Sequence, residues 1–245
     1  MERIRIFGDS ILKRIVYSEQ DNRYRTLPVE QVNELGKALD LEIETTTIFG
    51  CTVTKGMQLL QRAMKKNLEC DYVLLEFGGN DCDYLWDQVE QYPQQPHDPK
   101  TPLPVFSDTL ITMISLLKQR HIEPLLVTLP PVDSRRYLDH ICSSGLDKQK
   151  ILSWLKDVKT IERHQELYSL QIAKIALETQ TRLIDIRSAF LERKECSTLI
   201  CKDGIHPNEK GHALILETFA QYRRHKSTSR KLSSFSFDAP VCAGF

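Results

Sequence analysis

Three short motifs contain the residue types that serine-dependent acyl transfer needs. In chain order they are Gly8-Asp9-Ser10, Gly78-Gly79-Asn80-Asp81 and Asp203-Gly204-Ile205-His206. A serine hydroxyl becomes a good nucleophile when a base takes its proton, and a neutral imidazole suits that task near physiological pH. We therefore expect Ser10 to be the nucleophile and His206 its base. Asp203 can accept a hydrogen bond from the other ring nitrogen of His206 and so fix the tautomer of the imidazole.

Asn80 and Gly50 are candidates for stabilising the negative charge that develops on a carbonyl oxygen under attack. The side-chain amide of Asn80 offers N–H groups without a competing negative charge. Gly50 lacks a Cβ, so a substrate oxygen can approach its backbone N–H closely. The backbone N–H of Ser10 is the third expected donor of this oxyanion hole. We expect Asp81 to be structural and to bind neighbouring loop amides.

The elements that must position these residues follow from apolar segments that recur along the chain, each separated from the next by enough sequence for a helix. The predicted strands cover residues 4–7, 41–48, 72–77, 125–129 and 183–186. Helical spacing of apolar residues predicts helices over 29–39, 54–68, 106–120 and 161–179, and Asn208 is expected to cap a last helix. This alternation predicts a doubly wound α/β protein with five parallel strands between two helical layers. Residues that follow its strands meet at the carboxyl edge of the sheet.

Two longer segments interrupt the alternation beside the expected site. Residues 82–104 contain five prolines among aromatic residues, which predicts a long ordered loop, and residues 130–148 follow the fourth strand. Tyr84 and Trp86 either line the substrate pocket or pack the first segment against the protein. In the second segment, Arg135 and Arg136 either meet an anionic group of the substrate or form a solvated pair.

Length and composition favour one globular domain over residues 1–225 and a loose Ser-rich tail over 226–245. Lys plus Arg equals Asp plus Glu at 33 each, so no net charge favours nucleic acid. We find neither a signal peptide nor the roughly 20 apolar residues of a membrane span, which predicts a cytoplasmic protein. Seven cysteines without a C-x-x-C pair favour reduced thiols. No motif indicates an oligomeric state.

Two alternatives remain open at this point. Asp9, Asp81, Asp203 and His206 are metal-ligating residue types and could form the site of a metal-dependent hydrolase. A binding or scaffold module that keeps a hydrolase fold without its activity is the second alternative. The presence of all four residues Ser10, Asn80, Asp203 and His206 argues against that module, because a protein freed from catalysis has no chemical reason to keep them.

In these motifs the chain resembles the SGNH hydrolases, also called GDSL-type esterases or lipases. The matching blocks are Ile6-Phe7-Gly8-Asp9-Ser10, Gly50-Cys51-Thr52, Gly78-Gly79-Asn80-Asp81 and Asp203-Gly204-Ile205-His206-Pro207. Ile11 stands where the family name has leucine, which is a conservative change. The resemblance extends from about residue 4 to residue 222. It implies a flavodoxin-like, three-layer α/β/α fold and no required metal or other cofactor.

The resemblance also implies roles for individual residues. Ser10 is the nucleophile, Gly50 and Asn80 complete the oxyanion hole with the Ser10 amide, His206 is the base and Asp203 orients it. Family members act on simple esters, lysophospholipids, acyl thioesters or acetylated sugars, and the fold cannot choose among these substrates. We therefore predict a metal-independent serine esterase that acts on a small or medium carboxylic ester through an acyl-enzyme. An acyl thioesterase and a carbohydrate O-acetylesterase are the alternative substrate classes.

Overall fold

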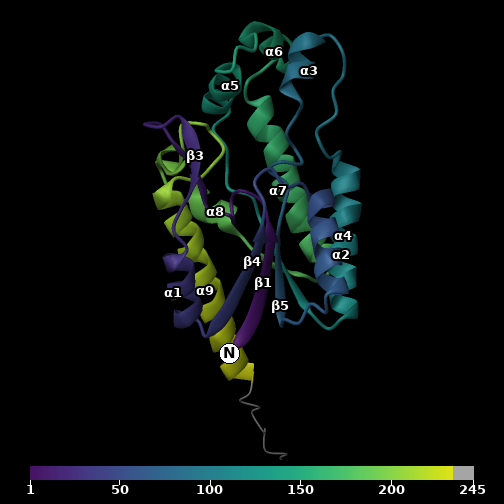
Figure 1. Cartoon of the computed structure of the whole chain (residues 1–245), viewed down its shortest axis with the longest axis vertical. Helices are drawn as coiled ribbons and strands as arrows, with labels where there is room; N and C mark the ends of the chain where they lie inside the picture. Colours follow the sequence, from purple (N-terminus) through teal and green to yellow (C-terminus); the bar gives the residue numbers. More distant parts are fainter. Residues whose placement is uncertain (234–245) are drawn as a thin grey trace, which may run out of the picture.

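Strands and helices alternate along most of the chain in the computed structural model, which describes residues 1–233 and the side chains of residues 1–224 (Figure 1). The strands are β1 (Glu2–Gly8), β2 (Ile15–Ser18), β3 (Arg23–Thr26), β4 (Leu41–Thr47), β5 (Tyr72–Glu76), β6 (Glu123–Val127) and β7 (Arg182–Ile184). The helices are α1 (Glu30–Ala38), α2 (Val53–Lys65), α3 (Trp86–Gln91), α4 (Leu103–Gln119), α5 (Ser134–Cys142), α6 (Lys148–Leu155), α7 (Thr160–Glu178), α8 (Ile186–Leu191), η1 (Cys196–Leu199, a 3-10 helix) and α9 (Glu209–Ser233). No helix in this part of the chain is both long and apolar enough to cross a membrane.

Five strands form one parallel sheet in the order β4-β1-β5-β6-β7. In the central register, Ile4 of β1 pairs with Ile43 of β4 on one side and with Tyr72 of β5 on the other. The chain leaves β1 toward β4 and then returns to build the other side, so the direction of winding reverses between β1 and β5. Ligands of open α/β sheets bind at the carboxyl end of such a switch point. The predicted fold, an α/β protein with a five-stranded parallel sheet, is confirmed.

Alternate side chains of the central strands belong to two apolar cores, one on each face of the sheet. Phe7, Val73 and Leu75 pack beneath α2, α4 and α7. Ile6 and Leu74 face the opposite side, which α1, α8 and α9 cover (Figure 1). Because successive side chains of a strand point to opposite faces, uninterrupted apolar strands are what a sheet covered on both faces requires. The three expected layers follow from this pattern.

Helices α3, α5 and α6 form a cap beyond the carboxyl ends of the strands (Figure 1). The cap has its own apolar cluster, which includes Trp86 and Val89 of α3, Leu138 of α5 and Ile151 of α6. The prediction of a loop throughout residues 82–104 was therefore wrong over Trp86–Gln91, and α5 interrupts the segment 130–148. The prolines do not prevent α3 because they lie outside it, and its buried Trp and Val stabilise the short helix by packing.

The sequence pattern missed one element and placed one boundary wrongly. Strands β2 and β3 form an antiparallel hairpin directly after the Ser10 turn. A loose tail was expected from residue 226, but α9 continues to Ser233, since residues 209–233 hold no proline and only one early glycine to end the helix. The rest of the expected tail, 234–245, lies outside the described residues. Asn208 does cap α9, because its Oδ1 accepts hydrogen bonds from the N–H groups of Lys210 and Gly211 at 3.1 Å each.

Candidate active site

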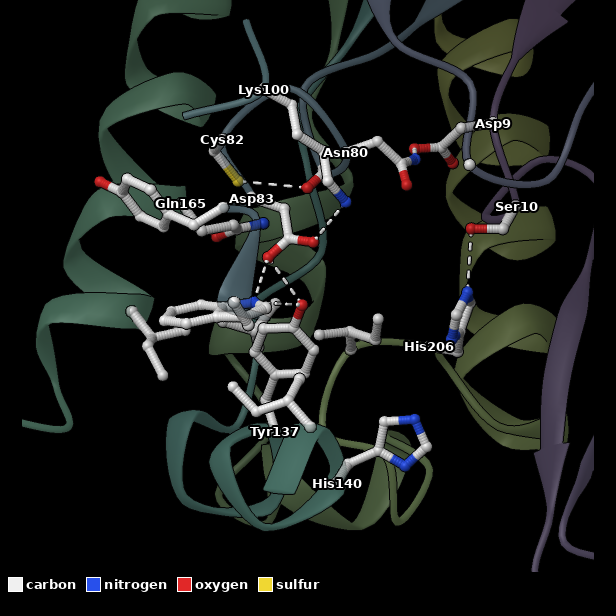
Figure 2. Close-up of a pocket in the computed structure, with 18 of the residues that line it drawn as sticks. Asp9, Ser10, Asn80, Cys82, Asp83, Lys100, Tyr137, His140, Gln165 and His206 are labelled. Carbon is white, nitrogen blue, oxygen red and sulfur yellow. Dashed lines mark hydrogen bonds and ion pairs between the residues drawn. The ribbon is translucent and has the colours of Figure 1, made fainter. Parts of the chain in front are cut away.

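Ser10 lies in the turn that follows β1, where its side chain reaches the carboxyl edge of the sheet. Its Oγ is 2.9 Å from Nε2 of His206, although the two residues are 196 positions apart (Figure 2). The turn is held by Asp9, whose Oδ1 accepts a hydrogen bond from the N–H of Ile11 at 2.8 Å. Ser10 and His206 are both buried, so their hydrogen bond is shielded from bulk water.

Asp203 and His206 share the short loop before α9. Nδ1 of His206 is 2.6 Å from Oδ2 of Asp203, and Oδ1 of Asp203 accepts hydrogen bonds from the N–H groups of Ile205 and His206 at 3.2 Å each. Burial alone would raise the pKa of Asp203, but these hydrogen bonds and the nearby imidazole lower the pKa below its ordinary value. Ionised Asp203 requires the proton on Nδ1, which leaves Nε2 free to accept the Ser10 proton.

Gly204 explains why this loop packs so closely. Its φ is +81°, and a Cβ at this position would lie 2.4 Å from the backbone nitrogen of Tyr137 in α5. The carbonyl of Gly204 also accepts a hydrogen bond from the N–H of Asp133 at 2.8 Å. A side chain at residue 204 is therefore excluded both by backbone conformation and by space. The loop that carries Asp203 and His206 is bonded to the start of a cap helix.

Gly50 and Asn80 lie next to each other at the ends of β4 and β5. Gly50 has a φ of +73°, and a Cβ there would be 4.0 Å from Oδ1 of Asn80. The amide Nδ2 of Asn80 donates to Oδ2 of Asp9 at 2.7 Å, which fixes the orientation of the amide and leaves its second hydrogen available. Among the described residues, the backbone N–H groups of Ser10 and Gly50 have no acceptor. Three hydrogen-bond donors thus line the cleft around Ser10.

Two buried carboxyl groups lie behind these donors. Glu76, the last residue of β5, is fully buried, and its Oε2 is 3.4 Å from the N–H of Asp9. Burial, followed by the charge of Asp9, raises the pKa of Glu76 well above its ordinary value, and burial also raises the pKa of Asp9. A protonated Glu76 beside an ionised Asp9 is the arrangement that avoids two buried negative charges. Asp9 then remains an acceptor for Ile11 and Asn80.

Asp81 does not face the cleft. Both of its carboxylate oxygens accept a hydrogen bond from the N–H of Val53, at 2.9 and 3.1 Å, and so bind the first turn of α2. Burial raises the pKa of Asp81 to about 6. The structural role expected for Asp81 matches these contacts. Of the four residues considered as metal ligands, Asp203 and His206 are bonded to each other, whereas Asp9 and Asp81 bind other partners. Within the described side chains no group of three or more His, Cys, Asp or Glu could hold a metal ion.

A cleft of about 770 Å³ extends from Ser10 and His206 beneath the cap. Figure 2 shows Ser10 and His206 on one side of this cleft and Asp83 and Tyr137 on the opposite side. Asp83 accepts hydrogen bonds from Tyr137 Oη at 2.7 Å, from Trp86 Nε1 at 2.8 Å and from Lys100 Nζ at 2.7 Å. Both oxygens of the carboxylate on the cap side therefore accept hydrogen bonds within the protein.

Of the four residues suggested as substrate contacts, two line the cleft and two do not. Tyr84 and Trp86 line it and also pack against each other, with ring centroids 5.5 Å apart, and their contact with a substrate stays a prediction. Arg135 is exposed and does not line the cleft. Arg136 also lies outside it, because its Nη1 donates to the carbonyls of Ser197 and Ile200. The sequence shows that an arginine is charged but does not show which groups its side chain will contact in the fold.

Three residues near His206 were not identified from the sequence. Tyr24 of β3 and Phe49 before Gly50 both contact the His206 ring, and His140 of α5 contacts Tyr24. The segment around Tyr24 lacks any long apolar run, so no sequence signal marked it. Phe49 could have been found from its position beside Gly50.

His212, in the last helix, is a packed histidine. It is buried and donates from Nε2 to the carbonyl of Ile15 at 3.0 Å, and burial lowers its pKa to about 4.

The fold and this arrangement of side chains agree with the comparisons with known proteins. The chain belongs to the GDSL-like lipase/acylhydrolase family, whose model matches residues 6–214. It is therefore an ester hydrolase. An isoamyl acetate-hydrolyzing esterase of Saccharomyces cerevisiae is 24% identical over 251 residues, covering 96% of this chain and 94% of that protein.

Solved structures are similar over nearly the whole chain. A lipase/acylhydrolase from Enterococcus faecalis superimposes with a TM-score of 0.59 at 18% identity, covering 92% of this chain and 97% of that one. A variant of an acetyl xylan esterase from Geobacillus stearothermophilus gives a TM-score of 0.60 at 18% identity, covering 91% and 94%. At these identities the structural likeness establishes the shared fold.

Proposed function

We propose that the protein hydrolyses small to medium carboxylic esters through an acyl-enzyme on Ser10. The observation that carries the proposal is the pair of hydrogen bonds that joins Ser10 Oγ to His206 Nε2 at 2.9 Å and His206 Nδ1 to Asp203 at 2.6 Å. A hydroxyl, an imidazole and a carboxylate in this order form the arrangement that activates serine in other hydrolases. Family membership supports ester hydrolysis as the reaction.

Each step of the reaction then has a residue to perform it. Ser10 Oγ attacks the ester carbonyl carbon while His206 Nε2 takes its proton, and the carbonyl oxygen becomes an oxyanion. The N–H groups of Ser10 and Gly50 and the free hydrogen of Asn80 Nδ2 stabilise this charge. His206 then gives the proton to the alcohol oxygen as the carbon–oxygen bond breaks. Water attacks the acyl-enzyme by the same route and releases the acid.

Asp203 keeps the imidazole in the required tautomer and stabilises the imidazolium that forms in each half of the reaction. Its lowered pKa supports this role, because Asp203 is then a carboxylate when the imidazole gains and loses the serine proton. The cleft is lined by more apolar than polar groups, which favours a simple carboxylic ester as substrate. The yeast relative is named for such an ester, isoamyl acetate.

The decisive test is the comparison of wild type with Ser10→Ala on a panel of esters and thioesters of graded chain length that also includes acetylated sugars. We expect Ser10→Ala to lose nearly all turnover and a fluorophosphonate probe to label the wild type at Ser10 alone. Full activity in Ser10→Ala would refute the nucleophile assignment. A folded wild type that neither reacts with the probe nor hydrolyses any member of the panel would favour the inactive binding module.

A further inference from the structure

The proposed acyl-enzyme reaction determines where the alcohol part of the substrate must lie, and the following inference rests on that proposed function. His206 has to give its proton to the alcohol oxygen, so this oxygen must come within hydrogen-bond reach of Nε2. The first carbon atoms of the alcohol then lie against the side chains around the His206 ring. The acyl group occupies another direction from the tetrahedral carbon.

Two aromatic rings surround His206 on the cleft side. The ring of Phe49 stacks on the imidazole with centroids 5.8 Å apart and an interplanar angle of 23°, and the ring of Tyr24 meets its edge at 5.1 Å and 63°. Tyr24 and Phe49 also contact each other, with centroids 5.0 Å apart. Both residues line the cleft, as does Ile205. An alcohol leaving from His206 therefore meets an aromatic and aliphatic wall.

The polar atom of this wall is already bonded. Tyr24 Oη lies 2.9 Å from Nε2 of His140, which joins the β2–β3 hairpin to cap helix α5. Burial, followed by the nearby charge of Asp203, raises the pKa of Tyr24, so its phenol stays neutral. A sugar carries several hydroxyls, and against these rings it would exchange their bonds to water for at most the remaining hydrogen-bonding capacity of Tyr24 Oη, which costs binding free energy. An alkyl or aryl group loses nothing comparable and gains contact with both rings.

We propose that Tyr24 and Phe49 form the subsite for the leaving alcohol and select an apolar alkyl or aryl alcohol over a sugar. Phe49 is 47% exposed at the mouth of the cleft, and a bound alcohol would cover part of this surface. Tyr24 is held in place by His140 and by the edge of the Tyr17 ring at 5.3 Å. The subsite thus combines one fixed ring with one ring at the opening.

Leu85 offers a matched control. It also lines the cleft and is 48% exposed, but it lies in the cap segment between Tyr84 and Trp86 and has no ring contact with His206. Phe49→Ala and Leu85→Ala therefore remove apolar surface of similar exposure from two different parts of one cleft. If the alcohol binds at Phe49, the preference of the enzyme among alcohols should change in Phe49→Ala and stay the same in Leu85→Ala.

The experiment measures kcat/KM for acetates of ethanol, 3-methylbutanol and benzyl alcohol and for acetylated xylose. These substrates share one acyl group and therefore one acyl-enzyme, so differences among them report on the alcohol. We expect the wild type to prefer benzyl and 3-methylbutyl acetate over acetylated xylose. Phe49→Ala should lower kcat/KM about tenfold for benzyl acetate relative to ethyl acetate, while Leu85→Ala leaves that ratio unchanged. Phe49→Leu keeps an apolar side chain and should keep the preference over the sugar.

The proposal is overturned if Phe49→Ala lowers kcat/KM equally for all four acetates, if Leu85→Ala changes the alcohol ratio as much as Phe49→Ala does, or if the wild type uses acetylated xylose as well as benzyl acetate. Circular dichroism of each variant separates unfolding from a change in selectivity. A wild type without Ser10-dependent turnover would instead overturn the proposed function, and the subsite with it. Ser10-dependent turnover with unaltered alcohol selectivity in Phe49→Ala overturns the subsite alone.

Discussion

Substitution of Asp203 by asparagine tests most sharply the proposed roles of Ser10, His206 and Asp203, because the change keeps the size of the side chain and alters its hydrogen bonding. The carboxylate now accepts three hydrogen bonds, from His206 Nδ1 and from the backbone N–H groups of Ile205 and His206. An amide has one oxygen and one donor group. Its oxygen can accept hydrogen bonds from the backbone donors or from the imidazole N–H, but not from both.

The backbone determines which orientation the amide takes. With its oxygen toward Nδ1, the amide would present its NH2 group to two backbone donors, at a cost of about 1–3 kcal/mol for each unsatisfied group. With its oxygen toward the backbone, the NH2 group donates to Nδ1, and the proton of His206 moves to Nε2. This tautomer cannot accept the Ser10 proton. We expect kcat to fall on the order of 10⁴-fold, as in other Ser-His-Asp sites, which corresponds to about 5.5 kcal/mol.

The assay is hydrolysis of an alkyl acetate followed by pH-stat titration, because an alkoxide leaving group needs the proton that His206 supplies. Asp83→Asn is the matched control: it alters another carboxylate of the cleft, bonded to Trp86 and Tyr137 rather than to His206, and should retain activity within about tenfold of wild type. A folded Asp203→Asn variant with activity within tenfold of wild type would refute the role given to Asp203.

Three further substitutions test the surroundings of the site. Asn80→Ala removes one of the three proposed oxyanion donors and should lower kcat about 10²- to 10³-fold in steady-state assays; an unchanged kcat would exclude Asn80 from this role. Burial raises the pKa of Asp81 from 3.8 to about 6, so its ionisation weakens the folded state as pH rises through this range. Asp81→Asn lacks that loss, and its free energy of unfolding relative to wild type should increase by about 2 kcal/mol between pH 4 and pH 7 in urea titrations; a constant difference would contradict the raised pKa. Gly204→Ala places a Cβ 2.4 Å from the backbone of Tyr137 and should lower the free energy of unfolding by more than about 2 kcal/mol; a normal melting curve would contradict the packing described for this loop.

The sheet and the meeting of distant residues at its edge could be predicted because both depend on simple periodicity. Apolar strands separated by helices require a parallel sheet, and Ser10, Gly50 and Asn80 each follow one of its strands. Parallel strands end on the same side, so these residues had to gather there. The loop with His206 precedes the last helix, which begins at the same edge. The hydrogen-bond distances at the site could not be predicted from the sequence.

The cap and the hairpin could not be predicted because their stability comes from long-range packing. Helix α3 is six residues long, and its helical pattern is hidden by neighbouring prolines. Strands β2 and β3 have four residues each, too few to show a period. No pattern in the sequence consequently predicted that Tyr24 would lie at the site. Arg136 was misleading for a related reason, since the carbonyl groups that it binds belong to a segment about sixty residues away.

The hydrogen bond between Asp133 and Gly204 couples the cap side of the cleft to the loop that carries His206, the proposed general base. Helix α5 forms part of the pocket roof, yet its first turn also holds the loop that positions His206. A change in the length or tilt of α5 would therefore displace His206 together with the roof of the cleft. In the part of the chain that the structure describes, no hydrogen bond joins α3 or α6 to this loop. Efforts to widen or narrow the substrate range by remodelling the cap should accordingly begin at α3 and α6 and leave the start of α5 untouched.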